Sequence, residues 1–96
     1  MVVELRKYGN SLGTRSLGAK IREDIEKNIL NDEETIFDFT DMEIISNSFA
    51  DECFAKLLLT YDFSTVKKYT TFINTNSSIK KIILGAINAR LKAITV

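Results

Sequence analysis

Three short β-rich runs alternate with three stretches of helical periodicity along this chain, and this alternation limits the folds open to it. Residues 2–7, 35–39 and 69–73 are rich in β-branched and aromatic residues. After each run, apolar residues recur every three or four positions, as they do on one face of an amphipathic helix. Helices of this length between consecutive strands require right-handed crossovers, which make the strands parallel. The pattern predicts an α/β domain of order βαβαβα, with a mostly parallel sheet covered by helices.

The first and third predicted helices have clear apolar faces. The first begins at Thr14, and its apolar residues recur every four positions: Leu17, Ile21, Ile25 and Ile29. The third follows several capping residues at 74–78 and keeps its apolar face as far as Leu91. Proline is absent from the chain, so no residue forces a break in either helix.

The second predicted helix begins with Ser48 as its N-cap. Asp51 and Glu52 follow three and four residues later, so we expect them in the first turn, at the positive end of the helix dipole and as a reciprocal cap on Ser48. Adjacent helical residues point about 100° apart, so these two carboxylates are not expected to share a proton. Cys53 falls on the apolar face of this helix and is expected in the core.

The length of the chain, 96 residues of which 45% are apolar, fits a single domain over residues 1–96. No apolar run approaches the ~20 residues that a membrane span needs. The N-terminus lacks the apolar core of a secretory signal peptide. We therefore expect a cytoplasmic protein that has no membrane partner.

The residue inventory argues against catalysis and metal binding. The chain has no histidine, the commonest general base and metal ligand, and Cys53 is its one cysteine. Without a histidine to activate it, that cysteine is not expected to act as a nucleophile. The sequence therefore predicts a protein that is not an enzyme and that holds neither a metal ion nor another cofactor.

Charge is strongly segregated along the chain, although thirteen basic and thirteen acidic residues balance. Residues 30–64 hold nine acidic residues and one basic residue, whereas residues 65–96 hold six basic residues and no acidic one. Either the acidic part docks a basic partner, or the acidic and basic parts lie beside each other in the fold, which is the simpler explanation. Because half of the charged residues would repel phosphate, no nucleic-acid partner is expected.

A glycine-containing loop before the first helix is a candidate anion-binding site. Gly13 permits close approach to the backbone, Thr14 caps the helix, and Arg15 is suited to bidentate contact with phosphate or carboxylate. Alternatively, the loop is an ordinary turn and cap, because it has neither P-loop nor GxGxxG spacing. In a parallel fold, this loop and the start of the second helix are expected to converge at the carboxyl ends of the strands.

Residues 36–52 carry a more specific pattern. The segment IFDFTDMEIISNSFADE contains a hydrophobic strand ending in Asp-Phe, a short turn, two apolar residues, a serine-bearing loop and a helix that opens with Phe-Ala-Asp-Glu. This pattern resembles the STAS superfamily, named for sulfate transporters and anti-sigma factor antagonists, and most closely its STAS-like families of unknown function. Weaker similarity at residues 13–15 and 73–76 extends the resemblance over most of the chain. The resemblance implies a STAS-like fold.

The resemblance also implies a role for Ser48. In anti-sigma factor antagonists, the corresponding loop carries a serine that is phosphorylated by a partner acting as both kinase and anti-sigma factor. That serine falls on Ser48, which is therefore a candidate phosphoacceptor. A phosphate at a helix N-terminus would meet free backbone N–H groups, although Asp51 and Glu52 in the same turn would repel it. The alternative role of Ser48 is a plain helix cap.

These features predict a non-catalytic STAS-like protein-interaction module in bacterial-type signalling. By resemblance, its partner is a histidine-kinase-like ATPase or an anti-sigma factor. The predicted docking face is the helix start with its preceding loop, which comprises Ser46, Asn47, Ser48, Phe49, Asp51 and Glu52. Phe49 would be an apolar anchor if its ring is exposed.

Two alternatives stay open. The chain could bind an anion or a nucleotide between Arg15 and the helix N-terminus at Ser48. It could also form a homodimer through exposed apolar residues of the second or third helix. A ligand-dependent gain in thermal stability would identify the first alternative, and sedimentation would identify the second.

Overall fold

The computed structural model describes residues 1–9 and 11–94. Its main sheet has three parallel strands in the order β1-β3-β5, with bounds β1 (Val2–Glu4), β3 (Thr35–Asp38) and β5 (Thr70–Ile73). Val3, Phe37 and Phe72 lie side by side in one register row. A separate two-stranded parallel ladder joins β2 (Ser11–Leu12) to β4 (Ile44–Ile45). The predicted α/β class with parallel strands is confirmed.

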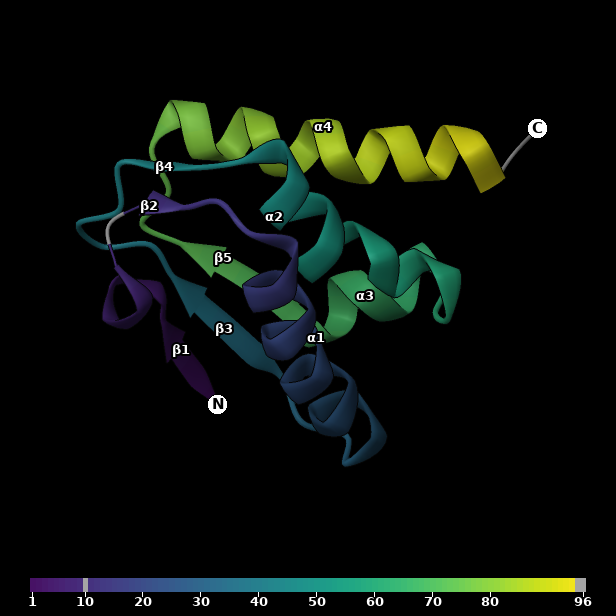
Figure 1. Ribbon diagram of the computed structural model, residues 1–96. Coiled ribbons are helices and arrows are strands. Elements are labelled where there is room, and N and C mark those ends of the chain that lie inside the picture. The colour runs from purple at the N-terminus through teal and green to yellow at the C-terminus, as the bar shows by residue number, and fades with distance from the viewer. Residues whose placement is uncertain (10, 95–96) are drawn as a thin grey trace.

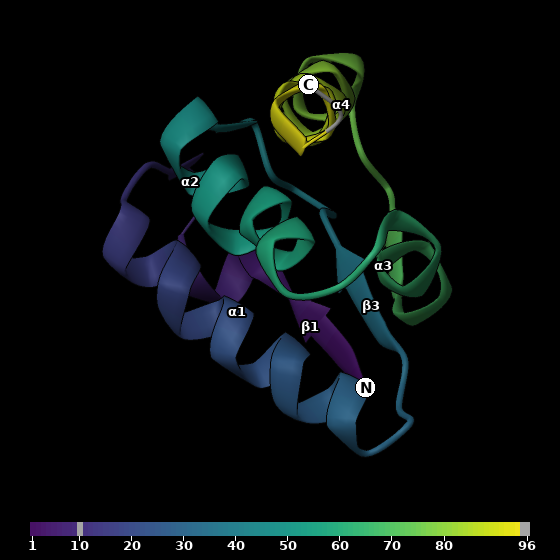
Figure 2. The same cartoon turned by 90° about the vertical axis from the view of Figure 1, so that its right-hand side faces the viewer.

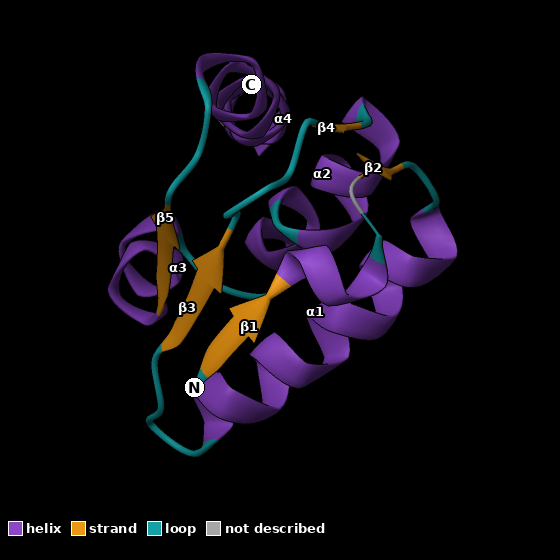
Figure 3. Ribbon diagram, turned by 90° about the vertical axis from the view of Figure 1, so that its left-hand side faces the viewer, coloured by secondary structure: helices purple, strands orange, loops and turns teal. Residues whose placement is uncertain are grey.

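Apart from the short helix that directly continues β1, the described helices lie on one side of the main sheet (Figure 1). The described helices are η1 (Leu5–Tyr8), α1 (Arg15–Leu30), α2 (Asn47–Cys53), η2 (Ala55–Leu59), α3 (Phe63–Tyr69) and α4 (Ser77–Ile94), where η denotes a 3₁₀ helix. Figure 3 shows the strands from the opposite, uncovered side. Accordingly, Val3 and Phe37 on the covered face are buried, whereas Val2 and Ile73 on the other face are exposed.

A search of the described helices finds none whose length and apolar content would let it cross a membrane.

The core between sheet and helices is built around phenylalanine rings. The ring centroid of Phe54, which directly follows α2, lies 5.0 Å from those of Phe37 and Phe72 in edge-to-face geometry. The predicted apolar face of α1 is also buried, with Ile25 fully enclosed. Cys53 is fully buried as well, as its position on the apolar helix face predicted.

The helix predicted to start at Ser48 starts two residues earlier, and its N-cap is Ser46. The Ser46 hydroxyl accepts a hydrogen bond from the Phe49 N–H at 3.0 Å and donates one to the Gly13 carbonyl at 3.0 Å. The Ser46 N–H donates to the Leu12 carbonyl at 2.8 Å, which extends the pairing of β4 with β2 to this residue. Ser46 and Ser48 both satisfy the local capping pattern, and the pairing of β4 with β2 selects Ser46 as the N-cap.

Two further element boundaries differ from prediction. The strand predicted over residues 2–7 ends at Glu4 and continues as η1. The helix predicted to begin at Ser48 ends as α2 at Cys53, and it is followed by η2 and by the unpredicted helix α3. The N-cap of α3 is Asp62, whose carboxylate accepts from the Thr65 N–H at 2.8 Å, so a capping signal for this helix was present in the sequence.

α1 and α2 pack side by side (Figure 2), and at Gly18 the contact is so close that a side chain would force its neighbours to shift. A Cβ atom at Gly18 would lie 3.1 Å from the Glu52 Cβ and from the Phe49 carbonyl oxygen, and 3.2 Å from the Cys53 nitrogen. Gly85, within α4, is the opposite case, because no atom lies within 4 Å of its Cβ position.

These two glycines make a matched pair for mutation. Gly18→Leu should lower the free energy of unfolding by about 1–3 kcal/mol, because the two helices must separate to admit the side chain. Gly85→Ala should raise it by up to ~1 kcal/mol, because alanine favours the helix and meets no obstacle. Chemical denaturation followed by circular dichroism measures both changes. A Gly18→Leu variant as stable as wild type would contradict the close packing of α1 on α2.

Candidate functional site

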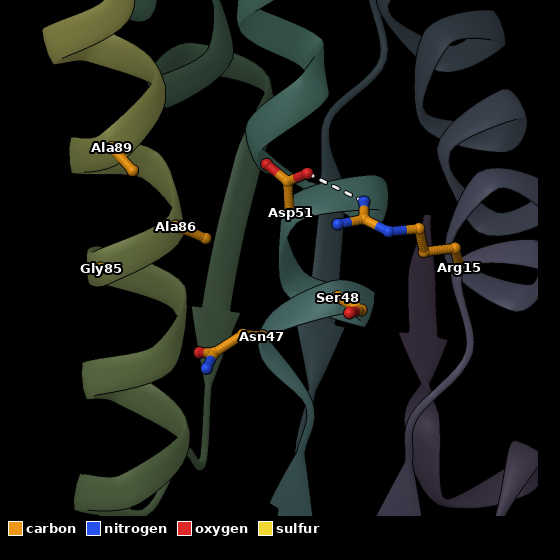
Figure 4. A pocket seen from close by; sticks show the side chains of 7 residues that line it. All are labelled: Arg15, Asn47, Ser48, Asp51, Gly85, Ala86 and Ala89. Carbon is orange, nitrogen blue, oxygen red and sulfur yellow. Dashed lines mark hydrogen bonds and ion pairs between the residues drawn. The ribbon is translucent and has the colours of Figure 1, made fainter.

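The strongest candidate site is a hollow of about 290 Å³ between α2 and α4, beside the start of α1. It is lined by Arg15, Asn47, Ser48, Asp51, Gly85, Ala86 and Ala89. Figure 4 shows Arg15 and Asp51 facing each other, with Ser48 one turn earlier on α2. The fold thus brings together the two segments singled out in the sequence, residues 13–15 and 46–52.

Gly13 and Thr14 shape the turn into α1. The Gly13 carbonyl accepts from the Ser46 hydroxyl, which joins this turn to the start of α2. The Thr14 hydroxyl accepts from the Leu17 N–H at 3.3 Å and caps α1. Of the three candidate anion-binding residues, Arg15 is the one that lines the hollow, and its side chain is 52% exposed.

Asp51 binds arginines from two different helices. Arg90 of α4 donates from Nε to Oδ1 and from Nη2 to Oδ2, both at 2.7 Å, and Arg15 of α1 donates from Nη1 to Oδ2 at 2.9 Å. The hydrogen bonds from Arg90, and next those from Arg15, lower the pKa of Asp51 from 3.8 to about 2. Asp51 therefore stays ionised at neutral pH and links α1, α2 and α4.

Glu52 is the most buried ionisable group of the same cluster. Its carboxylate accepts from Arg22 Nη1 at 2.7 Å and from Lys56 Nζ at 2.9 Å, and Arg15 Nη1 lies 3.4 Å away. Arg22 also donates to the Glu52 carbonyl. The hydrogen bonds from Arg22, then from Lys56, lower the pKa of Glu52 from 4.5 to about 2. We call these residues the arginine–carboxylate network, which comprises Arg15, Arg22, Asp51, Glu52, Lys56 and Arg90.

The predicted roles of Asp51, Glu52 and Phe49 at the helix start are corrected by this arrangement. Both carboxylates lie beyond the first turn of α2 and bind basic side chains, so they do not cap Ser48. Phe49 is fully buried, with its ring centroid 6.0 Å from that of Phe54, and it is not an apolar anchor for a partner. Phe49 lies on the buried face of α2 together with Cys53.

Asn47 and Ser48 are the accessible neutral residues of the predicted docking face. The Asn47 side chain is exposed and extends toward α4 (Figure 4). Ser48 is half-buried, and its hydroxyl forms no hydrogen bond with any residue that the structure describes. A free hydroxyl at the edge of a hollow is accessible to a partner.

The ionisable groups near the hollow are poorly suited to proton transfer at neutral pH. Asp51 and Glu52 are held in the ionised form. Burial raises the pKa of the Cys53 thiol and keeps it protonated. Within residues 1–9 and 11–94, no group of three or more acidic, cysteine or histidine side chains is arranged to hold a metal ion.

Asp38, the last residue of β3, organises a loop. Its carboxylate accepts from Asn74 at 3.0 Å, and from the Thr40 hydroxyl and N–H at 2.7 and 3.0 Å. These hydrogen bonds lower its pKa. Asp38 thereby joins the segments that follow β3 and β5, and it does not line the hollow.

The sequence analysis missed three members of the network. Lys56 follows Glu52 by four residues, a helical spacing that could have indicated their pairing. Arg22 and Arg90 lie 30 and 39 residues from the carboxylates they bind, so no local pattern pointed to them. The segregation of charge along the sequence was the one signal of these ion pairs. In the structure, Asp51 and Glu52 of the acidic middle part lie beside basic side chains of the first and last parts of the chain.

Comparison with known proteins identifies the family of the chain. No curated protein and no solved structure matches it significantly. The family model described as "STAS-like domain of unknown function (DUF4325)" matches residues 18–80, which run from the first turns of α1 to the first turn of α4. This range is more than half of the chain and includes the segment on which the resemblance rested. The chain therefore belongs to the STAS-like domain family of unknown function.

Proposed function

We propose that this STAS-like domain is a non-catalytic protein-interaction module in bacterial-type signalling, and that the hollow between α2 and α4 is its docking site. The observation that carries the proposal is the arginine–carboxylate network beside an accessible serine and asparagine. The network holds three helices in a defined arrangement, so the polar groups at the hollow are already positioned before a partner arrives.

The charge state of the network supports binding over catalysis. A general acid or base works best with a pKa near the ambient pH, whereas the pKa of both Asp51 and Glu52 is about 2. Arg15 and Asp51 instead present a fixed ion pair to the hollow, beside the Ser48 hydroxyl. Such a surface gives a partner specific polar contacts. By resemblance, that partner is a histidine-kinase-like ATPase or an anti-sigma factor.

Phosphorylation of Ser48 would change this surface directly. Ser48 and Asp51 are three residues apart on α2, so a phosphate on Ser48 would lie on the same helix face as the Asp51 carboxylate and repel it. Arg15 lines the same hollow and is half exposed, so it would bind either the phosphate or Asp51. In either case Asp51 would retain its two hydrogen bonds from Arg90. The modification would therefore reorganise the docking site without dissolving the network.

The test uses purified histidine-kinase-like ATPases and radiolabelled ATP. Label should enter the wild-type chain and a Ser78→Ala control, which changes an exposed serine at the start of α4, but not the Ser48→Ala variant. Ser48→Asp should weaken binding of the same ATPase by at least about tenfold, because it places a second carboxylate beside Asp51. Equal binding by wild type, Ser48→Ala and Ser48→Asp would refute the switch.

An anion or nucleotide site at Arg15 is the second candidate, because this guanidinium lies at the hollow next to Ser48. An anion would have to compete with Asp51 and Glu52 for it. A thermal-shift screen of nucleotides and inorganic phosphate distinguishes the two functions, since a ligand at 100 times its Kd adds roughly 2.7 kcal/mol of stability. A shift that Arg15→Met abolishes would favour the anion site, and no shift would favour the protein partner.

A further inference from the structure

A second concave surface lies between α3 and α4, on the face of α4 opposite the candidate site. Two hollows of about 260 Å³ each share Phe72, Leu84 and Ile87 in their lining and so form one continuous depression, which we call the α3–α4 groove. Figure 2 views the molecule from the side on which α3 and α4 lie. Gly85 and Ala89 line the other hollow, about half a helical turn away from Leu84 and Ile87 around α4.

The floor and walls of the α3–α4 groove are apolar. Ile83 and Ile87 of α4 are buried at its base, where Phe72 of β5 is partly exposed. Leu84 of α4 is 49% exposed and Phe63 of α3 is 39% exposed. Large apolar side chains that flank a shared depression form a contiguous patch, which differs from isolated exposed residues and marks a site of contact.

The residues that line the groove include two lysines and no acidic residue. Lys67 and Lys80 line it, and the exposed Lys68 and Lys81 follow them in sequence. None of these four lysines forms an ion pair with a described residue, whereas the arginines of the network all do. Residues 65–96 contain no acidic residue, so the positive charge beside the groove is not neutralised by its own segment.

We infer that the α3–α4 groove docks an amphipathic acidic segment of a partner protein, with apolar side chains against Phe72 and Leu84 and with carboxylates toward Lys67 and Lys80. The charge and polarity of the groove select this occupant, because an apolar floor with a lysine rim complements apolar side chains flanked by Asp or Glu. From Lys80 to Ile87 the groove follows α4 for about 10 Å, the length of two helical turns. A concave surface also suits a peptide better than a flat lipid surface. This site is separate from the docking site at Ser48.

A random 12-residue peptide display library tests the inference on the full chain. Peptides are selected on wild type and depleted on Leu84→Glu, which places a carboxylate on the groove wall. Selected peptides should combine apolar residues at helical spacing with Asp or Glu. Failure to enrich any peptide specific for wild type, or enrichment of basic or neutral ones, would overturn the inference.

Fluorescence anisotropy with the selected peptide then maps the groove. Leu84→Glu and the double variant Lys67→Glu, Lys80→Glu should each raise the Kd at least about tenfold, and the double variant should also lose the salt dependence of binding. The matched control is Leu59→Glu, since Leu59 is an exposed leucine, 64% accessible, outside the groove lining. Unfolding midpoints of all variants verify that they fold. A control that weakens binding as much as Leu84→Glu would refute the assignment.

Two other occupants are distinguished by further measurements. If the wild-type chain binds vesicles of equal phosphatidylserine and phosphatidylcholine, and Leu84→Glu abolishes this binding, the occupant of the groove is a membrane surface and not a peptide. If the wild-type chain sediments as a dimer and the Leu84→Glu variant as a monomer, the occupant of the groove is a second copy of this chain. Either result would overturn the inference without bearing on Ser48.

Discussion

Replacing Phe54 by alanine should lower the free energy of unfolding by about 3–5 kcal/mol. Its side chain is 1% exposed, and its ring contacts those of Phe37, Phe72 and Phe49 at centroid distances of 5.0, 5.0 and 6.0 Å. Removing the ring leaves a cavity between the sheet and α2 that these rigid neighbours cannot fill by small shifts. Because a domain of this size is stable by only ~5–15 kcal/mol, much of its stability would be lost.

Urea denaturation monitored by circular dichroism measures this loss. Phe63→Ala is the matched control, because it removes the same side chain from the exposed surface of α3. Its expected cost is below about 1 kcal/mol. Equal losses for the two variants would mean that Phe54 is not the centre of the core.

Replacing Glu52 by glutamine should lower the free energy of unfolding by about 2–3 kcal/mol at pH 7. The Glu52 side chain is 8% exposed, and the amide would remove an anionic partner from Lys56 and from Arg22, which keeps its ion pair with Glu26. Breaking a fully buried ion pair costs ~3–5 kcal/mol. We expect a slightly smaller loss here, because the side chains of Arg22 and Lys56 are 20% and 31% exposed to water.

The same carboxylate makes stability depend on pH. The pKa of Glu52 is lowered from 4.5 to about 2 in the folded chain, and that of Asp51 from 3.8 to about 2. Lowered folded-state values mean that the stabilisation is fully present above the ordinary values and is lost as the pH falls through about 2. Wild-type stability should therefore be level above about pH 5 and decline between pH 5 and 2.

Urea midpoints measured from pH 7 to pH 2.5 test both expectations. Glu52→Gln should start lower and decline less steeply with acid than wild type. Glu43→Gln is the control, because the Glu43 side chain is exposed. It should change stability by no more than about 0.5 kcal/mol and keep the wild-type slope. A Glu52→Gln variant with an unchanged slope would show that the arginine–carboxylate network is not formed in solution.

The class of fold could be read from the residues alone. Short β-rich runs between long amphipathic helices permit few arrangements other than parallel strands joined by crossovers. The start of α1 at Thr14 was also predictable, because capping and periodicity involve residues within one or two turns of each other. Residues 36–52, which carried the family resemblance, lie inside the range that the family model matches.

The location of the candidate site was predictable to a lesser extent. Parallel topology implied that the loops before α1 and α2 meet, and the hydrogen bond from Ser46 to Gly13 joins them. The local pattern did not distinguish Ser46 from Ser48 as the cap. The sequence also left open whether Phe49 is exposed, and the packing of its ring against Phe54 in the core decided that it is buried.

Only the packing of whole elements decided which serine caps α2 and which charges are paired. β4 pairs with β2 and thereby selects Ser46 as the cap. α1 and α4 pack on opposite sides of α2, so that Arg22 reaches Glu52 and Arg90 reaches Asp51. Local patterns act through neighbours a few positions apart, whereas these contacts join residues 30 or more positions apart and depend on how entire helices and strands lie against one another.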